Sequence, residues 1–310
     1  MHRYRPLAII LLQCLIWTPI KSQDTALQPD LATSRAEHAL ELQKPDGWLA
    51  LVGLEWLQSG DNTFGSAADN KIHLPSAAPP QLGVLRLEGA TVTLTPPPGG
   101  YPEGFLIAGQ PATTQTLHTD PDSDKNNPRL TIGSLVMYII QRGDRYGLRI
   151  KDSKSPGLVG FHGLKWFPAN AKYRVTARWI PYDPPRSTRF ATLIGTHYSQ
   201  PVPGAAQFAL GGKRYRLEPV VEEPNEEHTE AKLFFVIRDT TSKSTTYGAC
   251  RFLYTGFPDK GLTQPGKLVL DFNRLENPPC AYTPFATCPL PPPGNRLPIP
   301  IPAGEKRYHD

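Results

Sequence analysis

The residues best suited to chemistry in this chain of 310 residues lie in its C-terminal half. The apolar run at residues 245–254 is predicted to form a strand that carries Tyr247 and Arg251. Side chains an even number of residues apart along a strand share a face, so these two are expected to point the same way. If residues 232–238 pair with this strand as a hairpin, Asp239 is expected near the same end of the hairpin as Tyr247. Together, the three groups could bind an anionic or hydroxylated small molecule.

The same groups also have a structural interpretation, and the sequence leaves both open. A buried Arg and a buried Asp are usually paired to satisfy each other, so Asp239 could simply hold Arg251 beneath the C-terminal loop. Asp271 and Asn273 share a predicted face and present the same choice. They could bind a ligand, or they could cap the Pro-rich segment that follows through backbone hydrogen bonds.

Cys280 and Cys288 bound a Pro-rich loop whose chemistry depends on their oxidation state. In an oxidising compartment the two are predicted to form a disulfide, because the bridge would close a short loop. Two buried thiols, or a reactive or metal-binding thiol, are the alternatives. Cys250 lies in an apolar run and is expected to be a small buried hydrophobe. Tyr282, between Cys280 and Cys288, is predicted either to pack on the second β unit or to line a pocket.

Motifs that would fix a reaction are absent from the sequence. It contains no Gly-x-Ser-x-Gly elbow, no His-Glu-x-x-His, no Gly-x-Gly-x-x-Gly and no P-loop. It also has no Cys-x-x-Cys pair, so no metal site is expected, and no cofactor is indicated. His162, on the predicted connection between two units, is a further candidate for ligand binding. A lone His at such a place is more often only hydrogen-bonded.

The scaffold for these residues is expected to be mainly β, with two β-sandwich or barrel-like units after a short N-terminal helix. Pro contributes 35 residues and Gly 26, which leaves little room for long helices. Short apolar runs bounded by turn residues recur along the chain. The helix is expected over residues 30–44. Its predicted apolar stripe comprises Leu31, Ala32, Ala36, Ala39 and Leu40.

The predicted domain organisation has four parts. Residues 1–22 form a signal peptide, residues 23–46 a helix and its lead, residues 47–168 the first β unit and residues 169–310 the second. The numerous prolines after residue 277 exclude regular helix and sheet. The C-terminal segment is therefore predicted to run extended over the surface.

Residues 1–22 have the pattern of a secretory signal, with basic residues at the start, an apolar stretch over residues 7–17 and the small Ser22 at the end. The apolar stretch is too short to span a membrane. Cleavage near Ser22 would make the protein secreted or periplasmic. It would leave 30 of the 33 basic residues against 28 acidic ones, a net charge of +2. Such a balance does not favour binding to nucleic acid or to a membrane surface.

Residues 57–66, LQSGDNTFGS, and residues 69–75, DNKIHLP, resemble the opening of forkhead-associated domains. The resemblance implies a β-sandwich for the first unit. It does not extend to the residues that read phosphothreonine in that family, because Ser66 follows Gly65 where an Arg is needed for the bidentate phosphate contact. The resemblance therefore implies the fold without the binding.

The C-terminal half resembles a bacterial and archaeal family designated domain of unknown function sixteen eighty-four. The segments that carry this resemblance are FVIRDTT at 235–241, TYGACRFL at 246–253, LDFN at 270–273, NPPCAYTPFATCPLPP at 277–292, NRL at 295–297 and AGEK at 303–306. With residues 48–66, the resemblance covers most of the chain after the predicted signal. It indicates a family and implies no activity.

The leading hypothesis from the sequence is an exported β protein that binds a small molecule or peptide in a cleft near the C-terminal segment. One alternative is an enzyme of unknown class that uses Asp239, Tyr247 and Arg251, or Cys280. Another is a structural or interaction protein without a pocket, and the oligomeric state is not indicated. The candidate ligand-binding residues are Asp239, Tyr247, Arg251, Asp271, Asn273, Tyr282 and His162.

Overall fold

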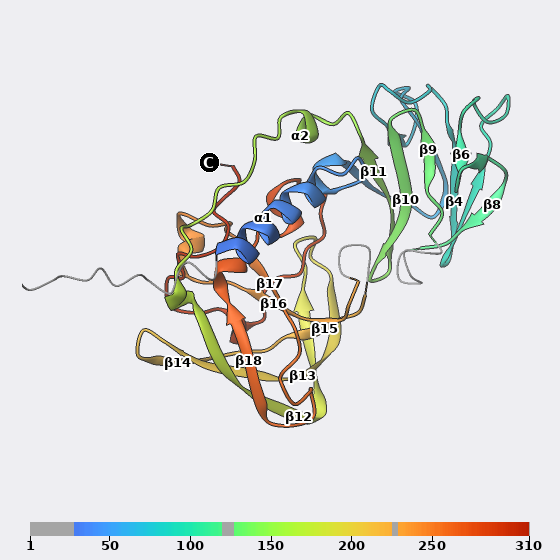
Figure 1. Cartoon of the computed structure of the whole chain (residues 1–310). Coiled ribbons are helices and arrows are strands. Elements are labelled where there is room, and N and C mark those ends of the chain that lie inside the picture. The colour runs from blue at the N-terminus through green and yellow to red at the C-terminus, as the bar shows by residue number, and fades with distance from the viewer. Residues whose placement is uncertain (1–27, 120–126, 225–228, 310) are drawn as a thin grey trace, which may run out of the picture.

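The computed structural model describes residues 28–119, 127–224 and 229–309 (Figure 1). The signal peptide predicted at residues 1–22 lies outside the described residues. The strands in the described ranges form four sheets, none of which closes into a barrel. The mainly β fold predicted from the sequence is confirmed, with sandwich-like units rather than barrels. None of the helices in these ranges combines the length and apolar composition needed to cross a bilayer.

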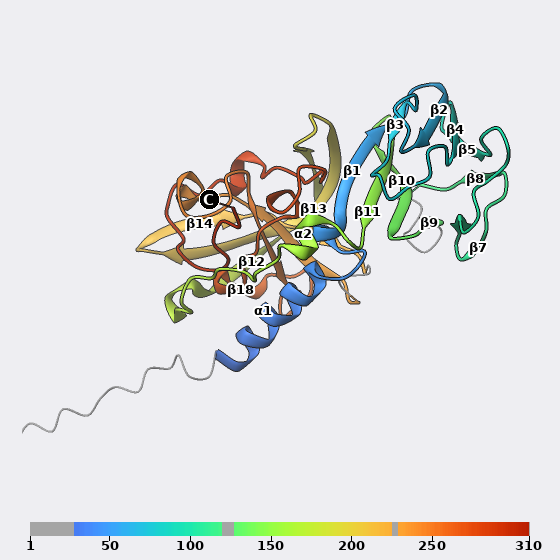
Figure 2. The same cartoon turned by 90° about the horizontal axis from the view of Figure 1, so that it is seen from above.

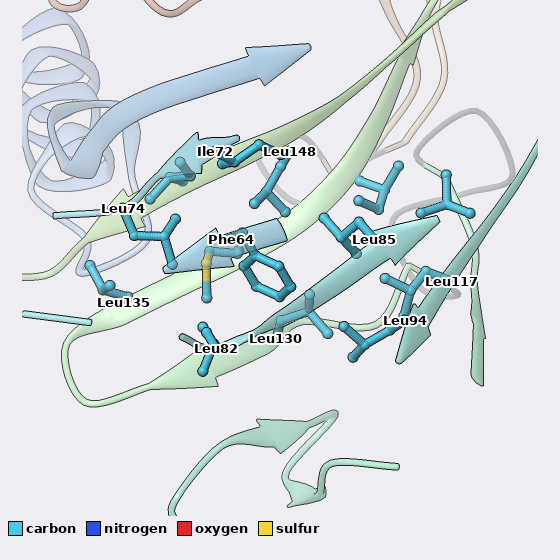
Figure 3. Packing of buried hydrophobic residues seen from close by; sticks show 14 of the residues in the cluster. Phe64, Ile72, Leu74, Leu82, Leu85, Leu94, Leu117, Leu130, Leu135 and Leu148 are labelled. Atoms are coloured by element: carbon cyan, nitrogen blue, oxygen red, sulfur yellow. The ribbon is translucent and has the colours of Figure 1, made fainter. Parts of the chain in front are cut away.

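The first β unit is a sandwich of two sheets. Its strands are β1 Leu51–Trp56, β2 Gly60–Gly65, β3 Ile72–His73, β4 Gly83–Glu88, β5 Thr91–Thr95, β6 Leu106–Ile107, β7 Gln110–Pro111, β8 Gln115–Leu117, β9 Leu130–Ile132, β10 Leu135–Arg142 and β11 Arg145–Asp152. One sheet has the order β1-β11-β10-β9-β6-β7 and the other β3-β2-β4-β5-β8. Phe64 and Leu85 from one sheet meet Leu130 and Leu148 from the other in the core (Figure 3). Because faces alternate along a strand, Arg149 on β11 points away from this core.

The second β unit also packs two sheets face to face. Its strands are β12 Arg174–Ala191, β13 His197–Leu210, β14 Lys213–Leu217, β15 Val220–Glu222, β16 Lys232–Ile237, β17 Arg251–Thr255 and β18 Gly266–Asp271. The sheet β14-β13-β12-β18 lies against the sheet β15-β16-β17. Trp179 of β12 is fully buried between them. Gly204 on the paired strand makes room for it, since a Cβ there would lie 2.5 Å from the indole ring.

Helical segments are few and mostly short. They are α1 Gln28–Leu42 and α2 Pro156–Val159, with 3-10 turns at η2 Trp48–Ala50, η5 Ala171–Tyr173, η6 Thr240–Lys243, η7 Phe272–Arg274, η8 Pro279–Ala281 and η9 Pro293–Asn295. The helix α1 forms where the sequence predicts it, and it lies against the second unit in both views (Figures 1 and 2).

The predicted apolar stripe of α1 is only partly correct, because Leu31 is buried but Ala32, Ala36 and Leu40 are exposed. Leu40 is 65% exposed, whereas Leu31 and Leu42 are buried. The helix docks through polar side chains as well as through these two leucines. Arg35 donates from Nη2 to the backbone oxygens of Phe167 at 3.2 Å and Asn273 at 3.4 Å. Periodicity of apolar residues alone therefore could not identify the docking face.

The C-terminal segment is extended, as predicted, apart from the turns η8 and η9. It forms single β-bridges to four different parts of the molecule: Thr192 with Pro289, Arg238 with Arg296, Phe252 with Glu276, and Trp166 with Glu305. Leu297, Ile301 and Ala303 of this segment are buried in the core of the second unit. The segment therefore does more than cover the surface, because it completes that core.

The strand predicted over residues 245–254 is shorter than expected, since β17 begins only at Arg251. The Thr241 backbone oxygen accepts the N–H groups of residues 244, 245 and 246, so these amides turn the chain instead of pairing with β16. Tyr247 consequently lies in a loop and does not share a strand face with Arg251. The first register pair of β16 and β17 on this side joins Ile237 to Arg251.

Candidate functional site

A cavity of about 810 Å³ lies between α1, the outer face of the first unit and the second unit. The helix lines it with Ser34, Glu37, His38, Glu41 and Leu42, which recur at intervals of three and four residues and so share one face of the helix. The C-terminal segment contributes Tyr282, Cys288 and Pro289 to the wall.

His38 lies between two carboxylates at the wall of this cavity. Its Nδ1 is 3.3 Å from Oε2 of Glu276, and its Nε2 is 3.4 Å from Oε2 of Glu305. The Tyr282 hydroxyl is 3.2 Å from the same Nε2. The His38 side chain is 18% exposed, so the ring is held in place but can still be reached from the cavity. An imidazole with a carboxylate at each nitrogen can hold and pass on a proton.

Glu305 is fully buried, and its carboxylate is surrounded by hydrogen-bond donors. It accepts from the backbone N–H of Asn277 at 2.8 Å and from Nδ2 of the same residue at 2.7 Å. The Tyr282 hydroxyl is within hydrogen-bond distance of both carboxylate oxygens. Burial and the charge of Glu305 raise the pKa of Tyr282 well above its usual value, so the phenol stays protonated and donates.

The backbone at Gly304 brings Glu305 to this position. Gly304 has a φ of +78°, in the left-handed region that favours glycine. A Cβ at this position would lie 2.4 Å from the Leu275 backbone oxygen. In turn, that oxygen accepts the N–H of Glu305 at 2.7 Å. The close approach of the two backbones therefore needs a glycine immediately before the buried carboxylate.

Arg149 and Trp48 form another part of the cavity wall. Arg149 projects from the outer face of β11 and is only 5% exposed. Its Nη1 donates to the Tyr138 hydroxyl at 3.3 Å, and its guanidinium carbon lies 5.4 Å from the centre of the Trp48 ring. Phe234, Phe252 and Tyr254 add aromatic surface nearby in the wall. The cavity thus combines flat apolar surfaces with charged groups of both signs.

Cys280 and Cys288 lie next to each other, and both are free thiols in this structure. The backbone N–H of Cys280 donates to Sγ of Cys288 at 3.3 Å. A hydrogen bond from the Cys288 thiol lowers the pKa of Cys280, and the same contact together with burial raises that of Cys288. The predicted disulfide is not formed here and stays a prediction. Cys250 is fully buried, as expected for a small hydrophobe.

Asp239 and Arg251 form a buried ion pair outside the cavity wall. The Arg251 guanidinium also donates to the backbone oxygens of Ala303 at 2.6 Å and Ile301 at 3.0 Å. Asp239 caps the turn η6 by accepting from the N–H and the hydroxyl of Thr241. Burial lowers the pKa of Arg251, while the Asp239 charge opposes that shift. This geometry supports the structural interpretation of the pair, which fixes the C-terminal segment.

Most of the other predicted ligand-binding residues form hydrogen bonds with backbone groups. The Tyr247 hydroxyl donates to the Cys280 backbone oxygen at 2.8 Å. Asp271 caps η7, and Asn273 bonds Asn170 through both ends of its amide at 3.0 Å. His162 is exposed on the connection between the units.

Of the seven candidates, only Tyr282 lines the large cavity. Asp271 lines a smaller hollow of about 430 Å³ at the surface of the second unit. Across the described ranges, no group of three or more His, Cys, Asp and Glu side chains is arranged to hold a metal ion.

His38, Glu276, Glu305 and Arg149 could not be identified as site residues from the sequence. The first three come from a helix, an isolated bridge and the C-terminal segment, so no spacing in the sequence connects them. A partial signal exists for Arg149, because it interrupts the apolar run of β11 with a charge on a strand that is buried on both faces.

Comparisons with known proteins agree with the resemblances seen in the sequence. An uncharacterized protein from Haloarcula marismortui, solved by NMR, is 27% identical over 49% of this chain and 80% of its own, with a TM-score of 0.39. Two forkhead-associated domains are each 13% identical over 32% of this chain, with TM-scores of 0.21. One was crystallised with the intracellular domain of another protein, and the other comes from work on phosphothreonine-dependent interactions. The chain covers 97% and 92% of these domains.

No curated protein matches the chain. A family match is present in the C-terminal half, where the sequence analysis placed it. Residues 48–66, which the sequence analysis included in the resemblance, lie outside the matched range. Residues 159–306 match the family described as protein of unknown function DUF1684.

Proposed function

We propose that this protein binds a small organic molecule in the cavity between α1 and the two β units. The observation that carries the proposal is the cavity itself, whose volume of about 810 Å³ falls within the range of small-molecule sites. Its wall combines aromatic rings with many polar and charged side chains, which can orient a bound molecule. The volume suits a small molecule better than a folded partner.

The proposal is tested by comparing masses of the purified protein under native and denaturing conditions. A retained ligand appears as mass that is lost on denaturation. Ser34→Trp places a large ring in the cavity wall, and Ala36→Trp places the same ring on the exposed side of the same helix. The wild type and Ala36→Trp are expected to carry ligand that Ser34→Trp lacks. Equal native and denatured masses for the wild type, with no stabilisation by any compound of a metabolite library, would refute the proposal.

A second candidate function is an enzyme that moves a proton through His38. The observation that favours it is the placement of His38 between Glu276 and Glu305 at the cavity wall. Such an arrangement orients the ring, so that one nitrogen can give or take a proton at the cavity wall. His38→Gln would then retain the ligand but abolish its turnover. Turnover that survives in His38→Gln would exclude this candidate.

Export is part of the proposal and rests on the composition of residues 1–22. Protein recovered from outside the cytoplasm is expected to begin at Gln23, which N-terminal sequencing would show. Recovery of the intact N-terminus from the cytoplasmic fraction alone would contradict export.

A further inference from the structure

Arg149 is a buried cation in the cavity wall without an acidic partner. Its side chain is 5% exposed, and its Nε is buried with no hydrogen-bond partner. Nη1 is occupied by the Tyr138 hydroxyl. Among the residues the structure describes, no carboxylate lies within ion-pair distance of the Arg149 guanidinium, and Nη2 has no hydrogen-bond acceptor. Burial of an unpaired charge is costly, so proteins normally pair or solvate such groups.

Two further cations lie near Arg149, while the carboxylates of the cavity wall belong to Glu37, Glu41, Glu222 and Glu276 and none of them pairs with it. The Lys151 ammonium and the Arg129 guanidinium both lie over the same Tyr138 ring, at 5.6 and 4.0 Å from its centre. Arg149 itself is 5.6 Å from that centre. Three cations thus lie around one ring, and neither neighbour supplies the negative charge that Arg149 lacks.

Another arginine of this chain shows what the free donors of Arg149 are suited to bind. Arg86 holds the carboxylate of Asp61 through Nε at 2.6 Å and Nη2 at 2.9 Å. These are the two donors that lack an acceptor on Arg149. A carboxylate carries one charge and two coplanar oxygens, so a single guanidinium edge matches it in charge and shape. A phosphate monoester carries almost two charges near neutral pH and would need further donors.

We infer that the ligand is a small organic carboxylate whose carboxyl group pairs with Arg149 and whose apolar part lies against Trp48. This inference rests on the proposed function, since it names the chemistry of the molecule that fills the same cavity. The aromatic surface of Trp48 lies beside the guanidinium, at 5.4 Å, so a flat apolar group attached to the carboxylate would contact the indole. Aromatic carboxylates are therefore the appropriate probes.

One test needs no ligand. Arg149→Met replaces the guanidinium with an apolar side chain of similar length. If Arg149 is unpaired in the ligand-free protein, its replacement removes an unpaired buried charge. The dialysed variant is then expected to have the melting temperature of the wild type or a higher one. A melting temperature several degrees below that of the wild type would assign Arg149 a structural role and overturn the inference.

A second test uses defined probes. Benzoate, phenylacetate and indole-3-acetate are titrated calorimetrically into the wild type, Arg149→Met and Arg86→Met, each beside its neutral amide and beside phenyl phosphate. At least one acid is expected to bind the wild type and Arg86→Met and to lose roughly tenfold or more in affinity in Arg149→Met. The matching amide is expected not to bind the wild type measurably.

The outcomes separate the inference from the proposed function. Amides that bind as well as acids, acids that bind Arg149→Met unchanged, or a preference for phenyl phosphate would overturn the carboxylate assignment. The proposed function would survive these results if Ser34→Trp abolished the binding. No binding of any probe, together with a wild type that carries no ligand, would refute both.

Discussion

The Tyr282 hydroxyl lies 2.8 Å and 2.9 Å from the two carboxylate oxygens of Glu305. The two residues are separated by most of the Pro-rich segment, so this hydrogen bond ties the segment to itself beside the cavity. It also fixes the carboxylate that faces His38.

Removal of this donor is predicted to destabilise the protein. Tyr282→Phe leaves the buried Glu305 carboxylate with one donor fewer, at an expected cost of about 1–3 kcal/mol in the free energy of unfolding. Urea denaturation followed by circular dichroism measures that cost. Tyr308→Phe is the control, because Tyr308 packs against the same ring without donating to Glu305. Equal stability of the two variants would show that the hydrogen bond contributes nothing.

Gly304 is predicted to tolerate no side chain. Gly304→Ala combines a φ of +78° with a contact of 2.4 Å to backbone, so the free energy of unfolding is expected to fall by about 2 kcal/mol or more. Gly294→Ala is the matched control, since a Cβ there meets nothing within 4 Å. A loss of the same size in both variants would contradict the role assigned to Gly304.

Asp239 and Arg251 are predicted to act on stability and not on ligand binding. Asp239→Asn leaves the Arg251 charge buried without its partner, at an expected cost of about 3–5 kcal/mol. Thermal unfolding and native mass spectrometry are measured together, and the retained ligand is expected to be unchanged. Asp61→Asn breaks the exposed pair with Arg86 and should have a much smaller effect. Loss of ligand in Asp239→Asn without loss of stability would instead place the pair in the site.

The Cys280 thiol is predicted to be the most reactive of the three described cysteines. The hydrogen bond from Cys288 lowers its pKa below the ordinary value of 9.0, so the thiolate forms at lower pH. In the reduced protein, alkylation by iodoacetamide should therefore rise with pH and reach its midpoint below pH 9. Cys288→Ala removes the donor and should move that midpoint upward, whereas Cys250→Ala should not. Faster labelling of Cys250 would contradict this assignment.

The disulfide predicted between Cys280 and Cys288 can be tested by mass spectrometry. Protein recovered from an oxidising compartment is expected to be lighter than its reduced form by two hydrogen atoms. An unchanged mass after reduction would show that the thiols stay free in the cell.

Sequence patterns identified helices and strands better than they identified which face of each packs against the rest of the protein. The helix α1 forms close to the predicted residues because helix formation depends on local propensity. Its docking face depends instead on contacts of Arg35 and His38 with residues more than a hundred positions away in the sequence. The prediction of a strand at residues 245–254 was wrong over its first half for a related reason. The Thr241 carbonyl accepts the amides of Thr245 and Thr246, which the apolar pattern assigned to the sheet.

The site was harder to predict than the fold. The sequence suggests that Asp239 and Arg251 pair, and the burial of both side chains fits the structural interpretation of the pair. His38, Glu276 and Glu305 meet only through tertiary contacts, so no local spacing could bring them together. Tyr282 was identified because it lies in a constrained loop whose shape depends on prolines.

The contact between His38 and Glu305 joins residues that are synthesised at very different times. Strands of the first unit can pair while the rest of the chain is still being made, but the cavity lacks part of its wall until residues 276–289 have been added, and His38 lacks one carboxylate partner until Glu305 follows. Contacts between residues so far apart in the sequence form late, because closing the large loop between them costs conformational entropy. The proposed binding site is therefore assembled late, and a chain interrupted before residue 276 would lack the wall that the C-terminal segment contributes.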